Sequence, residues 1–109
     1  MSTINRVNGG TATASAGAAT LNNRFGVITS EALTTAQDAS YTLTVTNSQI
    51  AATDMVFVSV ANGTNSQGTT VVTKVTPAAG SLVIIVTNKH ASAVALNGTL
   101  KIAFGSFPV

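Results

Sequence analysis

Few side chains in this sequence are suited to acid–base or metal chemistry. They are one histidine, His90, and three carboxylates, Glu31, Asp38 and Asp54, and the chain has no cysteine. A hydrolytic triad needs a serine, a histidine and an acid held together. His90, however, lies in the loop-like stretch "TNKHAS", and the chain has no nucleophile elbow. We therefore predict no catalytic residue and no enzymatic activity.

Cofactor sites are equally poorly supported by the sequence. Each of the three carboxylates lies in or beside a predicted turn, and no two of them show the spacing of a calcium loop. Gly9, Gly10 and Gly17 precede no strand-to-helix junction of the kind that holds phosphate. We expect neither a metal nor another cofactor.

Nucleic acid and membrane are also unfavoured partners. The five basic residues are scattered along the chain and form no stripe: Arg6, Arg24, Lys74, Lys89 and Lys101. The longest apolar run, Leu82–Val86, is far shorter than the about 20 residues of a membrane-spanning helix. The first twenty residues lack the apolar segment of a secretory signal, so we expect a chain that is not a secretory precursor.

The stretch "YTLTVTN" alternates strictly between two kinds of side chain. Tyr41, Leu43 and Val45 can line a core, whereas the opposite face consists of threonines only, Thr42, Thr44 and Thr46. Thr-x-Thr rows occur on ice-binding surfaces, but threonine pairs also stabilise sheets through cross-strand contacts. A face of hydroxyls and methyls would also pack against another subunit at little cost in desolvation.

Low charge is the main feature of the composition. Only 7% of residues are charged, against about 25% in ordinary soluble domains. Soluble monomers usually carry interspersed charges, so this composition favours a surface covered by other subunits or by a partner lattice.

Short β-type runs recur from residue 25 onward, separated by turn residues. We predict a single β-sandwich or jelly-roll-like domain of about seven antiparallel strands over residues 25–109, preceded by a flexible or extended N-terminal arm over residues 1–24. The predicted strands are Phe25–Glu31, Tyr41–Thr46, Met55–Ala61, Thr70–Thr76, Leu82–Thr87, Ala93–Leu96 and Thr99–Phe104.

Two local patterns refine this expectation. Asn97-Gly98 is a strong hairpin signal, and an odd loop, Asn97-Gly98-Thr99, would keep the apolar residues of the last two strands on one face. "MVFVSV" and "SLVIIV" are nearly continuous apolar runs, which predicts that the outer face of these strands is also covered.

The chain from about residue 25 resembles small bacteriophage head decoration, or cement, proteins. The stretches "GVITSEALTTAQDASYTLTVTNSQIAATDMVFVSVANGTN" and "TPAAGSLVIIVTNKHASAVALNGTLKIAFGSFPV" carry the likeness, which is one of style and strand order without a fixed motif. The resemblance implies a homo-oligomer, a trimer in preference to a dimer, on the outer surface of a capsid. Such a protein would stabilise the lattice of major capsid proteins after assembly in the host cytoplasm.

On this hypothesis we assign two surfaces. Thr42, Thr44 and Thr46, with Phe57 of the "MVFVSV" run, are predicted to form the subunit interface, and Arg6 and Arg24 the capsid contact, since guanidinium groups pair well with carboxylates. Two alternatives remain: another virion component such as a tail, fibre or spike protein, and a stand-alone ice- or carbohydrate-binding β module.

Overall fold

The structure is a computed structural model that describes residues 10–108. This part of the chain is all-β: it contains eight strands and no helix, and hence no helix that could span a membrane. The strands are β1 (Thr11–Thr13), β2 (Ala18–Thr20), β3 (Phe25–Thr29), β4 (Ser40–Thr46), β5 (Met55–Asn62), β6 (Thr70–Ala78), β7 (Ser81–Asn88) and β8 (Leu100–Phe107).

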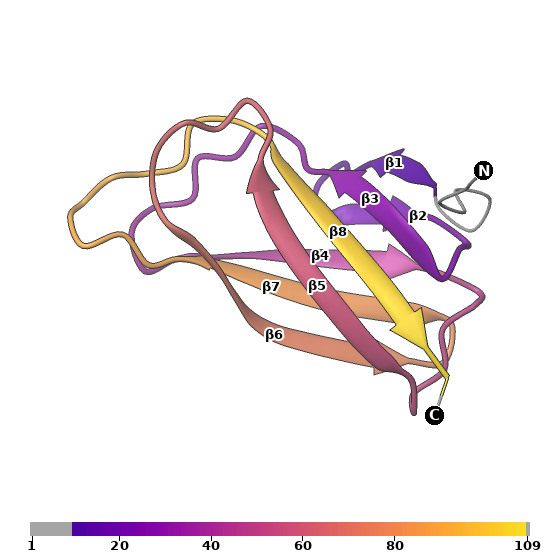
Figure 1. Cartoon of the computed structure of the whole chain (residues 1–109). Coiled ribbons are helices and arrows are strands. Elements are labelled where there is room, and N and C mark those ends of the chain that lie inside the picture. Colours follow the sequence, from indigo (N-terminus) through magenta and orange to yellow (C-terminus); the bar gives the residue numbers. More distant parts are fainter. Residues whose placement is uncertain (1–9, 109) are drawn as a thin grey trace, which may run out of the picture.

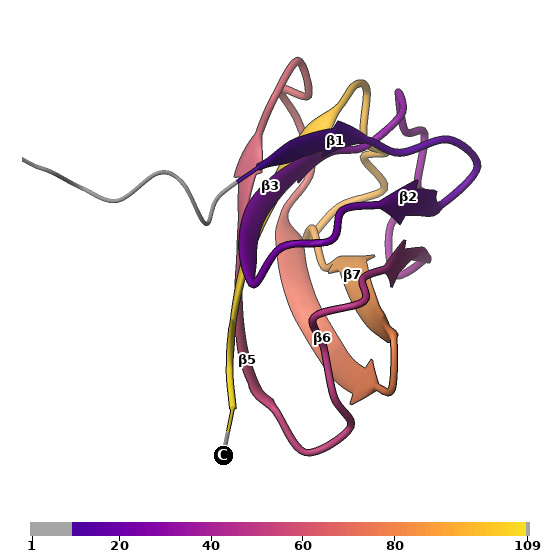
Figure 2. The same cartoon turned by 90° about the vertical axis from the view of Figure 1, so that its right-hand side faces the viewer.

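The strands form two four-stranded sheets that lie face to face (Figures 1 and 2). Sheet A has the order β1-β3-β8-β5, and sheet B has the order β2-β4-β7-β6. Both sheets are mixed, because β1 runs parallel to β3 and β2 parallel to β4, while all other neighbours are antiparallel. The all-β prediction is confirmed, but the sheets are not purely antiparallel.

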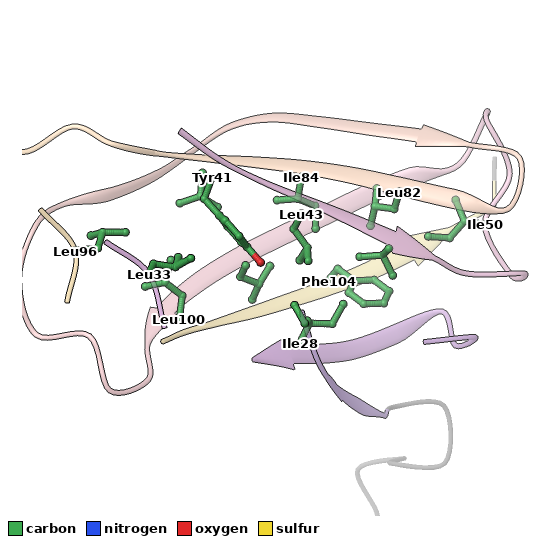
Figure 3. Close-up of a cluster of buried hydrophobic side chains, with 14 residues drawn as sticks. Ile28, Leu33, Tyr41, Leu43, Ile50, Leu82, Ile84, Leu96, Leu100 and Phe104 are labelled. Atoms are coloured by element: carbon green, nitrogen blue, oxygen red, sulfur yellow. The ribbon is translucent and has the colours of Figure 1, made fainter. Parts of the chain in front are cut away.

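Alternation of side chains creates the core between the sheets (Figure 3). Inward residues of the central strands, such as Leu43, Ile84 and Leu100, are fully buried. The alternate residues of β4 and β8 are exposed or half-buried. Burying each such aliphatic side chain contributes about 1.5–3 kcal/mol before the entropy of ordering is subtracted. The period-two pattern thus decides which side chains are left on the outer faces.

Residues 10–24 belong in part to the sheets. Strand β1 joins sheet A and β2 joins sheet B, and between them the chain turns through Ala16 and Gly17, both with positive φ. A Cβ on Gly17 would lie 2.7 Å from the Thr42 carbonyl oxygen, so this turn requires glycine. Residues 1–9 of the predicted arm, including Arg6, lie outside the described residues.

The predicted strand Ala93–Leu96 and the hairpin at Asn97-Gly98 are wrong. Residues 93–96 are a loop, and β8 pairs with β3 and β5 instead. The reason is a competing set of side-chain contacts: the buried Asn65 accepts the Asn97 N–H (2.7 Å), while the Asn97 amide oxygen accepts the Ser66 N–H (2.7 Å). These bonds hold residue 97 against another loop, where it cannot close a hairpin.

Candidate functional site

Three phenylalanines form an exposed cluster on the outer face of sheet A. Phe57 on β5 is 62% exposed, Phe107 on β8 42% and Phe25 on β3 36%. The Phe107 ring contacts both others edge to face, with ring centroids 5.4 Å apart in each pair. Met55, 54% exposed, lies opposite Phe107 in the register and extends the apolar surface. Together these four side chains are the aromatic cluster.

Glycine at position 105 creates the room between the rings. Phe25 and Phe57 both pair with Gly105, on its two sides, so the three residues form one row across the sheet. A Cβ at residue 105 would lie 2.9 Å from Cδ1 of Phe25. The resulting shallow hollow has a volume of about 330 Å³, and its lining is almost wholly apolar: Phe25, Phe57, Val58, Ser59, Ala103, Phe104, Gly105 and Phe107.

A buried carboxylate fixes the strand ends beneath the aromatic cluster. Asp54 Oδ2 accepts hydrogen bonds from the Ser106 hydroxyl (2.8 Å) and the Ala51 N–H (3.1 Å), and lies 3.4 Å from Nη1 of Arg24. The backbone hydrogen bond from Ala51, followed by that from Ser106 and the charge of Arg24, lowers the pKa of Asp54. Asp54, Ser106 and Arg24 each immediately precede a member of the cluster, so this one group orders three strands.

Arg24 is therefore engaged within the molecule. Its guanidinium pairs with Asp54, although the side chain remains 36% exposed at the margin of the aromatic cluster. The predicted capsid contact thus lies beside the cluster, while the other residue predicted for it, Arg6, lies outside the described residues.

The predicted threonine row is on the opposite side of the molecule. Thr42, Thr44 and Thr46 are exposed on the outer face of sheet B, where they pair with Ile85, Val83 and Ser81 of β7. Phe57 lies on sheet A. The four residues predicted as one subunit interface therefore divide between two outer faces and cannot form one continuous patch.

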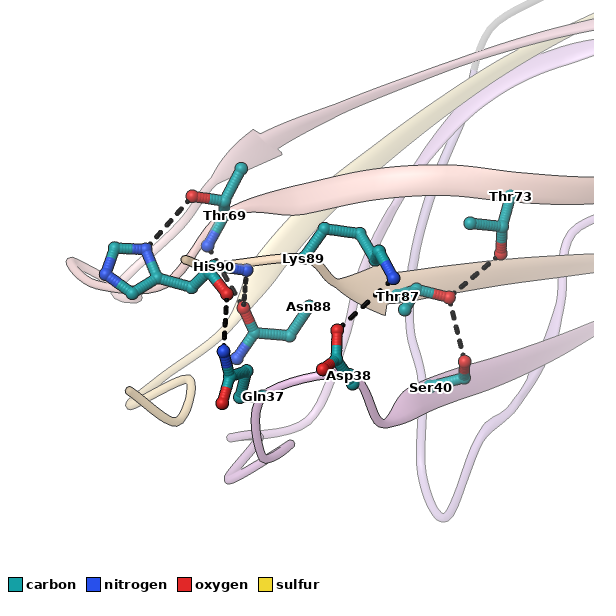
Figure 4. Close-up of polar contacts among 9 residues, drawn as sticks. All are labelled: Gln37, Asp38, Ser40, Thr69, Thr73, Thr87, Asn88, Lys89 and His90. Carbon is teal, nitrogen blue, oxygen red and sulfur yellow. Dashed lines mark hydrogen bonds and ion pairs between the residues drawn. The ribbon is translucent and has the colours of Figure 1, made fainter. Parts of the chain in front are cut away.

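Sheet B satisfies its own outer hydroxyls at one end of this face (Figure 4). The Thr87 hydroxyl bonds those of Ser40 (2.8 Å) and Thr73 (3.0 Å), which links three strands. Val83 and Ile85 are only half-buried, but threonines flank each of them on β4. Within residues 10–108 all the exposed phenylalanines lie on sheet A, and the large hydrophobic side chain exposed on the outer face of sheet B is Val71 of β6 (41%).

The residues considered for acid–base chemistry each contact a different partner. His90 Nδ1 contacts the Thr69 hydroxyl (3.2 Å), and Asp38 pairs with Lys89 at the surface (3.2 Å) (Figure 4). Glu31 accepts the Tyr41 hydroxyl (2.7 Å) and the Gly17 N–H (2.8 Å). Within residues 10–108, no three of the histidine and acidic side chains come together as a metal site.

The loop around His90 is held by a buried amide. Asn88 Nδ2 donates to the carbonyls of Thr35 and Val94, and its Oδ1 accepts the N–H groups of Thr69 and His90 (Figure 4 shows the last two). All the hydrogen-bonding capacity of this amide is used within the fold. The polar contacts among these loops thus have a structural role, which is to hold the loops together.

Comparison of the chain with protein-family models, with curated proteins and with solved structures finds no match. Of the aromatic cluster, only Phe57 was predicted from the sequence as an interface residue. Phe25, Phe107 and Met55 were missed. The signal was the large apolar side chains on both faces of "MVFVSV": the inward set is Val56, Val58 and Val60, which leaves the larger Met55 and Phe57 outside.

Proposed function

We propose that this chain is a non-enzymatic structural protein of a bacteriophage virion that binds the outer surface of the assembled capsid and stabilises it. The observation that carries the proposal is the aromatic cluster on the outer face of sheet A, on a chain with only eight residues of formal charge: five Lys or Arg and three Asp or Glu. The role in a virion comes from the resemblance of the sequence, and the cluster supplies a surface that fits it.

The strand pairing supports a single jelly-roll-like sandwich as the scaffold. Strand β3 pairs with β8, and β4 pairs with β7 in the facing sheet, so the antiparallel pairs are nested along the chain. Successive strands from β3 to β6 alternate between the sheets. This nesting is what results when a long hairpin is rolled around a core, as in the jelly rolls of capsid proteins.

The aromatic cluster has the chemistry of a protein-binding anchor. A phenylalanine buries about 150–250 Å² when it is fully covered, and buried aromatic anchors dominate the energetics of interfaces. Here the three rings contact one another over Gly105, and Asp54 fixes the strand ends that carry the cluster. Pre-ordering reduces the entropy lost on binding, so a small face can contribute a useful affinity.

Stabilisation of the shell would follow from selective binding. A protein that binds the expanded shell and not its dissociated subunits adds free energy to the assembled state, as any ligand stabilises the form that it binds. Repetition by symmetry multiplies weak contacts. On this proposal, Arg24 at the margin of the cluster pairs with a carboxylate of the capsid through its exposed part.

The test is co-sedimentation with capsids of the phage that encodes the chain. We expect binding to expanded shells and none to unexpanded precursors, and we expect Phe57→Ser to weaken it roughly 30-fold or more while Thr44→Ser has no effect. Electron cryo-microscopy of the pelleted shells would show on which side the protein lies. Failure of the folded wild-type chain to pellet with either shell would overturn the proposal.

The threonine row supports one second candidate, an ice-binding module. Thr42, Thr44 and Thr46 are exposed on one strand at the two-residue spacing that holds hydroxyls in a line. A thermal hysteresis assay measures this activity directly. Depression of the freezing point that Thr44→Lys removes would favour this candidate over the virion role.

A further inference from the structure

The four outer edges of the two sheets are not protected equally. A strand at an edge presents unpaired N–H and C=O groups, and natural proteins usually block it by short length, charge, proline or a bulge. Strands β1 and β2, at one edge of each sheet, have only three residues. Strand β6 carries Lys74, Pro77 and a bulge between Val72 and Lys74.

Strand β5 has none of these protections. It runs for eight residues, "MVFVSVAN", without a charge, a proline or a glycine. It pairs with β8 over its full length and, among the described residues, with no strand on its other side. Of the two long edge strands, β5 and β6, only β5 is thus left open.

The side chains of this edge are incompletely covered as well. Val56, Val58 and Val60 point inward from β5 but are only half-buried, in contrast to the fully buried residues of β8 beside them. On β6, the neighbouring edge of sheet B, Val72 and Val75 are half-buried in the same way. The side of the molecule between β5 and β6 is therefore an apolar seam with unpaired backbone along one margin.

We propose that this edge pairs with the same edge of a second copy of the chain. Two β5 strands would run antiparallel about a two-fold axis and join the two A sheets into one sheet of eight strands. An antiparallel strand edge is complementary to itself, and a two-fold contact brings identical surfaces together. Because β5 carries no charge, no like charges meet across the axis.

The pleat restricts the register of this pairing. Side chains that point outward must lie opposite side chains that point outward, so Phe57 meets an outward residue of the second copy: Met55, Phe57, Ser59 or Ala61. The two-fold axis then stands perpendicular to the joined sheet, and both aromatic clusters lie on the same face. A dimer would thus present two copies of the binding surface side by side, although its formation does not depend on capsid binding.

Light scattering at micromolar concentration tests the dimer with two matched charge variants. Ser59→Lys places a lysine on the exposed face of β5, and Thr44→Lys places one on the exposed face of β4. We expect the wild-type chain and Thr44→Lys to have the mass of a dimer. Ser59→Lys should weaken the dimer by roughly fivefold, because both copies then carry a lysine on the same face of the joined sheet near the axis.

Hydrogen exchange supplies a second readout that needs no variant. Dilution from the dimer should increase exchange at alternate amides of β5, whose N–H groups face away from β8, and should leave those of β6 unchanged. A monomer or a trimer in the scattering experiment would overturn the proposal. So would dissociation by Thr44→Lys and not by Ser59→Lys, which would assign the contact to the threonine row. Circular dichroism confirms that both variants are folded.

Discussion

The outer faces of the two sheets carry few charges, but they differ in how far their side chains are satisfied within the molecule. On sheet B, hydroxyls alternate with aliphatic residues that are half-buried, apart from the exposed Val71 of β6, and a chain of hydrogen bonds from Ser40 through Thr87 to Thr73 needs neither water nor a partner. On sheet A, the rings of Phe25, Phe57 and Phe107 contact one another edge to face and remain exposed. Two outer faces of one charge-poor chain can therefore differ in how much large apolar surface they leave exposed.

The largest effect should come from Phe57→Ser, which replaces a ring by a hydroxyl and so makes the outer face of sheet A resemble that of sheet B. Removal of the most exposed ring should weaken partner binding by about 2 kcal/mol or more, roughly 30-fold, as for other aromatic anchors. Thermal stability should change little, because the ring is 62% exposed. Binding to expanded shells and a melting curve, measured on the same preparation, check both statements.

Tyr41→Phe tests whether the threonine strand is held from its inner side. The Tyr41 ring extends into the core (Figure 3), and its hydroxyl donates to Glu31, a half-buried carboxylate. Loss of this bond should cost about 1–2 kcal/mol in the free energy of unfolding. Urea unfolding measures it, and a smaller loss than that for Thr44→Val would show that the outer row matters more.

The same residue predicts a dependence of stability on alkaline pH. Burial, helped by the hydrogen bond to Glu31, raises the pKa of the Tyr41 phenol above its ordinary value of 10.0. The folded chain therefore keeps a proton that the unfolded chain loses, so stability falls as pH rises above about 10. Tyr41→Phe should remove this part of the decline in the free energy of unfolding. Urea unfolding measured from about pH 8 to about pH 11 checks this.

Asp54→Asn should loosen the strand ends beneath the aromatic cluster. Its pKa is lowered in the folded chain, so the stability that it contributes is present above its ordinary pKa of 3.8 and is lost as pH falls below that value. We expect the variant to be less stable at neutral pH and to depend less on acid pH. Acid unfolding followed by circular dichroism is the measurement; an unchanged acid transition would contradict this role.

Much of the fold could be predicted because alternation is a local signal. The runs around Tyr41, Met55 and Leu82 predicted β4, β5 and β7 to within one or two residues. Strands β1 and β2 were missed because three-residue strands of Ala and Thr have no large apolar alternation; their place depends on partners more than ten residues away. The predicted hairpin at Asn97-Gly98 is absent because side chains distant in sequence, Asn65 above all, hydrogen-bond residue 97.

The candidate site was less predictable, because it depends on register. Phe25, Phe57 and Phe107 are far apart in sequence and meet only because β8 lies between β3 and β5. Nothing in the sequence states that Gly105 pairs with both Phe25 and Phe57. Strand order is set by the packing of the whole core, which no local pattern records.

Thr44→Val should have the smallest effect. It removes an exposed hydroxyl between Ala18 of β2 and Val83 of β7, where a methyl group fits the sheet equally well. We expect the free energy of unfolding to change by less than about 0.5 kcal/mol, with dimer mass and shell binding unchanged. Urea unfolding and light scattering check this. Loss of either association would show that sheet B also binds a partner, since removing one hydroxyl harms an outer face only where that hydroxyl meets something other than water.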